Sequence, residues 1–189
     1  MDLNNYTLHS GGAIGSDYAW GYVGSLYGLR NIRHYYYGVR TPYGNVHISE
    51  EEFKYGVEAV RHANLFLQRY GYERYLNLLA RNWVQVYNSQ AIYAITNDLL
   101  SNSTIVKGGT GWAVQMAINR GIKDIYVFHQ RLDKWVKCDY DSKQFLIFDD
   151  VPVLKTSFAG IGTRELKPNG LQAIIDVYNK ATKEPTLFD

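Results

Sequence analysis

Three glycine-containing segments combine residues that suit an anion. They are 10–17, 107–111 and 160–165. Glycine lets a ligand approach the backbone without meeting a Cβ atom, and the N–H groups that open a following helix favour negative charge. Lys107 adds a point charge, and Arg164 offers a planar fork of donors that matches phosphate or carboxylate. Together these residues predict a site for a phosphate-bearing ligand.

The elements that position these segments follow from hydrophobic periodicity. Each segment comes after a strand candidate and before a helix candidate. In an open α/β sheet, that edge is where ligands bind. Alternating strands and helices with short connections predict a Rossmann-like α/β fold, with a mostly parallel sheet and helices on both faces. A small β-hairpin is expected where 135–140 meets 144–148, and residues 1–189 are expected to form one nucleotide-binding domain.

The boundaries of these elements can also be predicted. Ser49, followed three residues later by Glu52, indicates a capping box at a helix start. Residues 31–49 are expected to be irregular, because Gly38, Pro42 and Gly44 interrupt them. The remaining strands are expected at 6–9, 91–96, 124–129 and 155–160, with 105–106 leading into the second glycine segment. The helices are expected at about 17–27, 50–68, 76–86, 112–120 and 169–181.

Several common site types do not fit this sequence. No segment has the GxxxxGK[ST] pattern of a P-loop, and none fits GxGxxG well, which disfavours ordinary ATPases and dinucleotide dehydrogenases. The five histidines lack metal-ligand spacing, and a single cysteine, Cys138, cannot form an internal disulfide. We therefore expect neither a metal nor a cofactor.

Composition limits the class of partner. The net charge is only +2, from 20 basic and 18 acidic residues, so a dedicated nucleic-acid-binding surface is not expected. No apolar run approaches the roughly 20 residues of a membrane span, and the first residues do not resemble a signal peptide. We expect a cytoplasmic protein with no membrane partner. The 17 tyrosines fit a base-stacking pocket, a subunit interface or ordinary packing.

The three glycine segments resemble the SLOG superfamily, which includes the Lonely Guy phosphoribohydrolases, DprA and the YpsA-like proteins. Residues 10–17 are similar to the SGGAxGxD loop of DprA-like and YpsA-like members. Residues 108–111, with the helix and strand that follow, resemble the GGTGT element of the Lonely Guy branch. Residues 158–164 resemble the first strand and GxGSR loop of such domains.

The order of these motifs differs from the family's order, in which the GxGSR-like strand comes first. Here it comes last. A circular permutation explains this order and is tolerated where chain ends lie close together. It predicts that the strand before Gly160 lies next to the strand before Ser10.

The resemblance also places Gln115 where Lonely Guy enzymes carry a glutamate. A glutamine cannot act as a general base. The resemblance therefore implies binding of a nucleotide-derived molecule without turnover, by a sensor or a sequestering protein, for example for an immune or second-messenger nucleotide. The alternatives are a nucleotide phosphoribohydrolase and a DprA-like single-stranded DNA mediator. A homo-oligomer is expected.

Further candidates lie outside the glycines. Asp17 either accepts hydrogen bonds from a ribose or base or interacts with its helix dipole. Arg81 and Asn82 lie beside an apolar helix stripe, and Arg40 lies in a loop that could cover the ligand. Glu165 is expected to be a surface or helix-start acid, and no catalytic residue is expected. The candidate ligand-binding residues are Ser10, Gly11, Gly12, Ala13, Gly15, Ser16, Asp17, Arg40, Arg81, Asn82, Lys107, Gly108, Gly109, Thr110, Gly111, Gly160, Gly162, Thr163 and Arg164.

Overall fold

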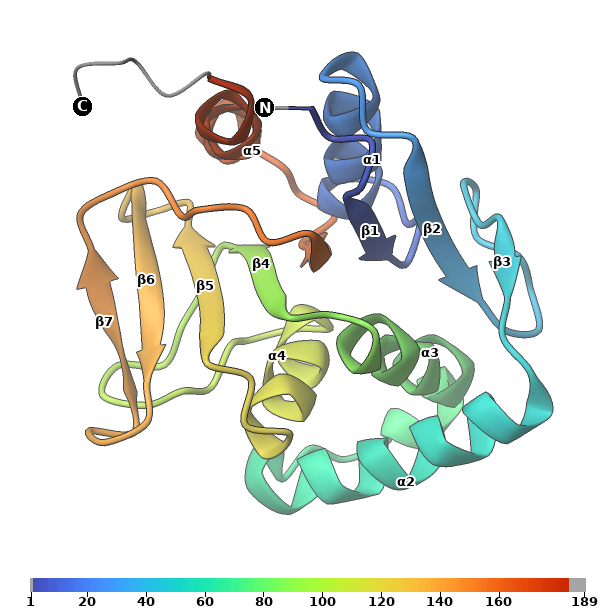
Figure 1. The fold of residues 1–189 in the computed structure, drawn as a ribbon. Helices are drawn as coiled ribbons and strands as arrows, with labels where there is room; N and C mark the ends of the chain where they lie inside the picture. The colour runs from blue at the N-terminus through green and yellow to red at the C-terminus, as the bar shows by residue number, and fades with distance from the viewer. Residues whose placement is uncertain (1, 184–189) are drawn as a thin grey trace.

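The structure is a computed structural model, and it describes residues 2–183. Within these residues, eight strands form one sheet in the order β3-β2-β1-β8-β4-β5-β6-β7 (Figure 1). The six strands from β3 to β5 in this order are parallel, and β6 and β7 continue the sheet as an antiparallel hairpin. The predicted Rossmann-like, mostly parallel α/β sheet is confirmed.

The strands are β1 (Thr7–Ser10), β2 (Asn31–Tyr36), β3 (Val46–His47), β4 (Ala91–Thr96), β5 (Asp124–His129), β6 (Lys134–Asp139), β7 (Gln144–Phe148) and β8 (Ser157–Gly162). The helices are α1 (Ser16–Leu26), α2 (Glu50–Leu67), α3 (Leu76–Tyr87), α4 (Thr110–Asn119) and α5 (Pro168–Thr182), with a short 3₁₀ helix at Tyr72–Tyr75.

The helices cover both faces of the sheet, each through its own apolar core. On one face, α1 and α5 pack around the fully buried Trp20, Phe158 and Tyr178. The Tyr178 hydroxyl donates to the backbone oxygen of Trp20 at 2.8 Å and so joins the two helices. On the other face, α2, α3 and α4 bury a second cluster that includes Val60, Ala80 and other small or aliphatic residues. The sheet therefore lies between two layers of helices (Figure 1).

The position of β8 in the sheet matches a specific prediction. β8 lies between β1 and β4 and runs parallel to both, with Leu8 opposite Phe158. Among the described residues, the last strand is therefore next to the first, as the motif order predicted. Circular permutation as the cause of this arrangement stays a prediction.

Several predicted bounds differ from the structure: β1, β6 and α1 are shifted by one residue, α4 begins two residues earlier than expected, and three further regions were wrong. Residues 31–49 are not all irregular, because β2 precedes the turn at Gly38 and pairs with β1, and β3 follows that turn. The strand expected at 155–160 begins and ends two residues later, so Gly160 lies inside β8. Residues 105–106 form no sheet strand; Val106 makes only an isolated bridge to Leu99.

Other local predictions are confirmed. The Ser49 side chain accepts the Glu52 N–H, and the Glu52 carboxylate accepts the Ser49 N–H, which completes the capping box of α2. β4, β5 and β7 have the predicted bounds. Among the described residues, no helix has the length and apolar character that crossing a membrane requires.

Candidate ligand-binding site

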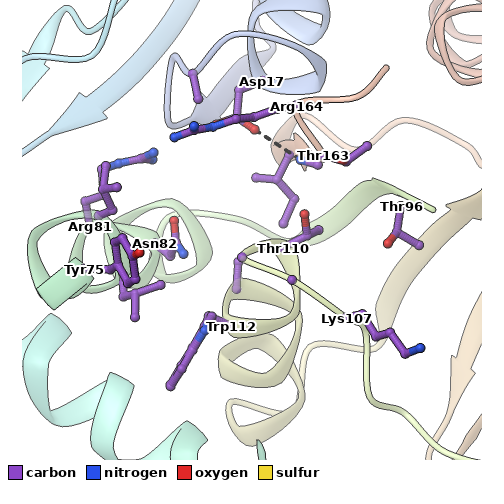
Figure 2. Close-up of a pocket in the computed structure, with 18 of the residues that line it drawn as sticks. Asp17, Tyr75, Arg81, Asn82, Thr96, Lys107, Thr110, Trp112, Thr163 and Arg164 are labelled. Atoms are coloured by element: carbon purple, nitrogen blue, oxygen red, sulfur yellow. Dashed lines mark hydrogen bonds between the residues drawn. The ribbon is translucent and has the colours of Figure 1, made fainter. Parts of the chain in front are cut away.

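A cavity of about 1010 Å³ lies at the carboxyl edge of the parallel strands. Its volume is at the upper end of the range usual for small-molecule sites. The loops after β1, β4 and β8, one face of α3 and the segment after α2 enclose it (Figure 2). The predicted residues that line it are Ala13, Asp17, Arg81, Asn82, Lys107, Gly108, Gly109, Thr110, Gly162, Thr163 and Arg164. The fold thus brings all three glycine segments to one site.

Arg81 lines the cavity from α3 and is only 5% exposed. Its guanidinium lies directly against Gly11, where a Cβ atom would stand 1.6 Å from Nη1. Nε and Nη1 of this side chain are buried and have no hydrogen-bond partner among the described residues. Burial lowers the pKa of Arg81, Asp17 opposes that shift, and the positive charge of Arg164 adds to it. A buried cation with unpaired donors is costly, so this arrangement favours an anion in the cavity.

Asp17 joins the first glycine segment to the third. Its Oδ2 accepts the Gly11 N–H at 3.2 Å, and its Oδ1 accepts the Gly162 N–H at 3.1 Å. Burial raises the pKa of Asp17, while the charge of Arg81 and the backbone N–H groups lower it. Both carboxylate oxygens therefore have protein partners, and the side chain holds two loops together beneath the cavity.

The third segment is fixed against the start of α1. The backbone oxygen of Thr163 accepts both the N–H and the hydroxyl of Ser16, at 3.0 and 2.8 Å. Gly15 has φ +97°, and its Cα lies so close to the Arg164 backbone that a Cβ would stand 2.5 Å from the Arg164 carbonyl oxygen. Figure 2 shows the Arg164 side chain pointing toward the end of Arg81. Two guanidinium groups thus approach one region of the cavity.

The second segment is held by a residue that sequence reasoning missed. Arg69, just beyond α2, donates from Nη1 to the Gly108 oxygen at 2.6 Å and from Nη2 to the Val106 oxygen at 2.7 Å. Its guanidinium also lies over the Trp112 ring, 5.5 Å from the centroid. Arg69 belongs to no recognisable motif, so only the fold reveals its position. It supports the glycine backbone at the start of α4.

Some predicted residues do not line the cavity but shape its walls. Gly111 and Gly160 allow close packing. A Cβ at Gly111 would stand 1.9 Å from the Val106 oxygen, and a Cβ at Gly160 would stand 2.5 Å from the Trp20 ring. Arg40 donates from Nε to the Gly44 oxygen at 2.6 Å, and its loop reaches the cavity only through its neighbours Thr41 and Pro42. The predicted residues outside the lining are Ser10, Gly11, Gly12, Gly15, Ser16, Arg40, Gly111 and Gly160.

Gln115 also lies outside the cavity lining. It is buried within α4, and its Nε2 donates to Asn119 Oδ1 at 2.9 Å. The chemistry of the cavity therefore depends on other groups. Among the described residues its carboxylates are Asp17, Asp98 and Glu165; Asp98 pairs with Arg131 at 3.1 Å, and Glu165 accepts from Asn97 at 3.2 Å.

Comparison with known proteins identifies no relative. No family model, no curated protein and no solved structure matches this chain. In the part of the chain that the structure describes, no group of three or more His, Cys, Asp or Glu side chains could hold a metal ion. The geometry of the cavity is therefore the basis for any functional assignment.

Proposed function

We propose that this protein binds a phosphate-bearing, nucleotide-derived small molecule without consuming it, as a sensor or a sequestering protein. The observation that carries the proposal is Arg81, a buried guanidinium with two unpaired donors beside the cavity. A phosphate in the cavity places negative charge and hydrogen-bond acceptors next to the guanidinium, whose only nearby counter-charge among the described residues is Asp17. Arg164 approaches the same region from the opposite wall (Figure 2).

The start of α4 supports a ligand with negative charge. Gly108 has φ +71°, and neither Gly108 nor Gly109 has a neighbouring atom within 4 Å of an added Cβ. The backbone N–H groups of Gly109 and Thr110 have no acceptor among the described residues. Helix N-termini of this kind favour phosphate groups.

Binding without turnover rests on the state of the cavity carboxylates. A glycosidic hydrolase uses a carboxylate as a general acid, base or nucleophile. Both Asp17 oxygens already accept backbone N–H groups, and Asp98 is paired with Arg131. Glu165 is exposed at the rim, where its partner is the Asn97 amide. Each of the three carboxylates therefore has a partner in the protein, and none is left unpaired beside Arg81, where the phosphate is expected.

The test is mass spectrometry of the small molecule that copurifies with the native protein. The same molecule is then added back, and its loss and the release of base or phosphate are followed. We expect a phosphorylated nucleotide derivative, recovered unchanged after the protein is denatured. Steady turnover at about 1 per second or faster would instead identify a hydrolase.

A further inference from the structure

Aromatic side chains gather at one end of the cavity lining. Tyr70, Tyr72 and Tyr75 come from one short segment and all line the cavity. The Tyr72 ring packs on Trp112, with centroids 5.2 Å apart. Residues Tyr70 and Tyr75 are 97% and 55% exposed, and neither ring contacts another ring among the described residues. Large exposed aromatic rings at a cavity rim are typical of binding surfaces.

This segment is anchored at its start. The Asn64 side chain accepts the Arg69 N–H at 2.9 Å and donates to the Arg69 carbonyl at 3.0 Å. The Arg69 guanidinium is bonded to the second glycine segment on the far side. The backbone of this segment therefore places Tyr70 and Tyr75 at the cavity, although only the Tyr72 ring packs on another ring among the described residues.

Tyr75 lies directly before the helix that carries Arg81. It precedes α3, and Tyr75, Leu78 and Asn82 follow the i, i+3, i+7 spacing of one helix face. Figure 2 shows Tyr75 beside Asn82, with Arg81 on the same wall. Tyr75 and Arg81 are six positions apart in the sequence, and both line the same cavity.

Asn82 adds a polar group beside this ring. Its Oδ1 accepts from Gln85 Nε2 at 3.3 Å, which orients the amide. Its Nδ2 has no acceptor among the described residues. The wall thus combines an exposed ring, an aliphatic side chain at Leu78 and an amide donor. Flat aromatic bases stack on rings and accept hydrogen bonds at their edges.

We infer that the Tyr75 ring is the stacking surface for an aromatic base, with the phosphate of the same molecule at Arg81. This inference rests on the proposed function and deepens it, because it names the part of the ligand that the α3 wall recognises. It assigns Tyr75 to recognition of the base and not to recognition of the phosphate.

The experiment compares probes with and without a base on the full chain. Calorimetry measures binding of the four common nucleoside 5′-monophosphates and of ribose 5-phosphate to the native protein and to Tyr75→Ala and Tyr75→Phe. We expect at least one nucleotide to bind more tightly than ribose 5-phosphate. Tyr75→Ala should weaken that nucleotide by roughly fivefold or more, leave ribose 5-phosphate unchanged, and be rescued by Tyr75→Phe.

The control is Tyr55→Ala, because Tyr55 is similarly exposed on α2 but lies outside the cavity lining. It should bind both probes like the native protein. If the nucleotides and ribose 5-phosphate bind the native protein equally, or if Tyr75→Ala binds the nucleotide normally, the base site is wrong and the phosphate site stands. If no probe binds at all, the proposed function fails together with this inference.

Discussion

Two buried polar clusters lie at opposite edges of the parallel sheet, and they differ in whether their polar atoms have hydrogen-bond partners. At the amino edge, His9 Nδ1 is 2.9 Å from the Tyr35 hydroxyl, and His9 Nε2 is 3.0 Å from Ser157 Oγ. Ser157 Oγ in turn donates to the Asn88 carbonyl at 2.5 Å. At the carboxyl edge, Arg81 has two buried donors with no partner among the described residues.

Under the proposed function, this difference separates a structural cluster from a binding site. Buried polar groups are normally paired, and an unpaired one costs stability. The chain of bonds through His9 is complete at each ring nitrogen, so it needs nothing from outside the protein. Arg81, in contrast, has two donor atoms without a partner among the described residues. A ligand that pairs with this side chain would enter through the cavity beside it. Substitutions in the two clusters should therefore have different effects.

The largest effect is expected at Arg81. Arg81→Met removes the charge and both unpaired donors, and hydrogen bonds to charged groups contribute about 1.5 to 3 kcal/mol each. Binding of the copurifying molecule should weaken by roughly a hundredfold or more. The free energy of unfolding without ligand should change little, because the two lost donor atoms have no partner among the described residues and Asp17 keeps its two backbone N–H donors when its charge interaction with Arg81 is lost. Calorimetry and urea denaturation measure the two quantities.

Arg69→Met is the matched control for that substitution. Both Arg69 donors already have backbone acceptors, so its removal should lower the free energy of unfolding by about 1 to 3 kcal/mol. If Arg81→Met destabilised the ligand-free protein as much as Arg69→Met, Arg81 would be a structural residue and the contrast between the two edges would fail.

The second effect is acid sensitivity, which comes from His9 and from His34, a buried histidine whose pKa is affected by the charge of Arg81. Burial lowers the pKa of His9 from 6.5 to about 4, with a smaller contribution from Arg33. Burial and then Arg81 lower the pKa of His34 to about 4. As the pH falls, the two histidines become protonated in the unfolded chain before they do in the folded protein. The contribution of the neutral histidines to the free energy of unfolding is therefore complete above about pH 6.5 and is lost as the pH falls toward 4.

Urea denaturation at a series of pH values measures this loss. Each histidine contributes at most about 3 kcal/mol. His9→Gln should flatten the dependence of the unfolding free energy on pH while leaving ligand affinity at pH 7 unchanged. An equally steep dependence in His9→Gln would show that the amino-edge cluster does not keep its histidine neutral.

The third effect separates stability from binding. Tyr35→Phe removes the hydroxyl that pairs with His9 Nδ1, and the free energy of unfolding should fall by about 1 to 2 kcal/mol. Tyr37→Phe is the control, because its hydroxyl bond to Glu50 is exposed and should contribute little. Ligand affinity should be native in both variants. Weaker binding in Tyr35→Phe would mean that the two edges are coupled.

Much of this fold follows from the sequence. The apolar runs of β4 and β5 are long enough and regular enough to fix their bounds, and the Ser49–Glu52 pair marks the start of α2. β2 was missed because its residues mix charged and aromatic types, and burial begins only at His34. β8 was placed two residues early because a glycine inside a strand looks like the start of a loop.

The site was predictable in outline and not in detail. The glycine segments located the cavity because strand ends meet at one edge of a parallel sheet. The sequence does not show which glycines line the cavity and which allow close packing, as Gly108 and Gly111 do respectively. It also hides Arg69 and Tyr75, because contacts between distant segments determine their roles.

The smallest expected effect concerns Arg164, and it tests whether the cavity has one anion-binding group or two. Arg164 is exposed, whereas Arg81 is buried. An exposed guanidinium is partly screened by solvent, so Arg164→Ala should weaken binding by about tenfold, less than Arg81→Met. Arg164→Lys should recover only part of the loss, since a lysine cannot make two parallel bonds to phosphate. Stability should hardly change, because the backbone at Arg164, and not its side chain, contacts Gly15.

Calorimetric titration with the copurifying molecule measures all three affinities. Native affinity in a folded Arg164→Ala variant would show that this segment is only a structural turn and that Arg81 binds the anion alone.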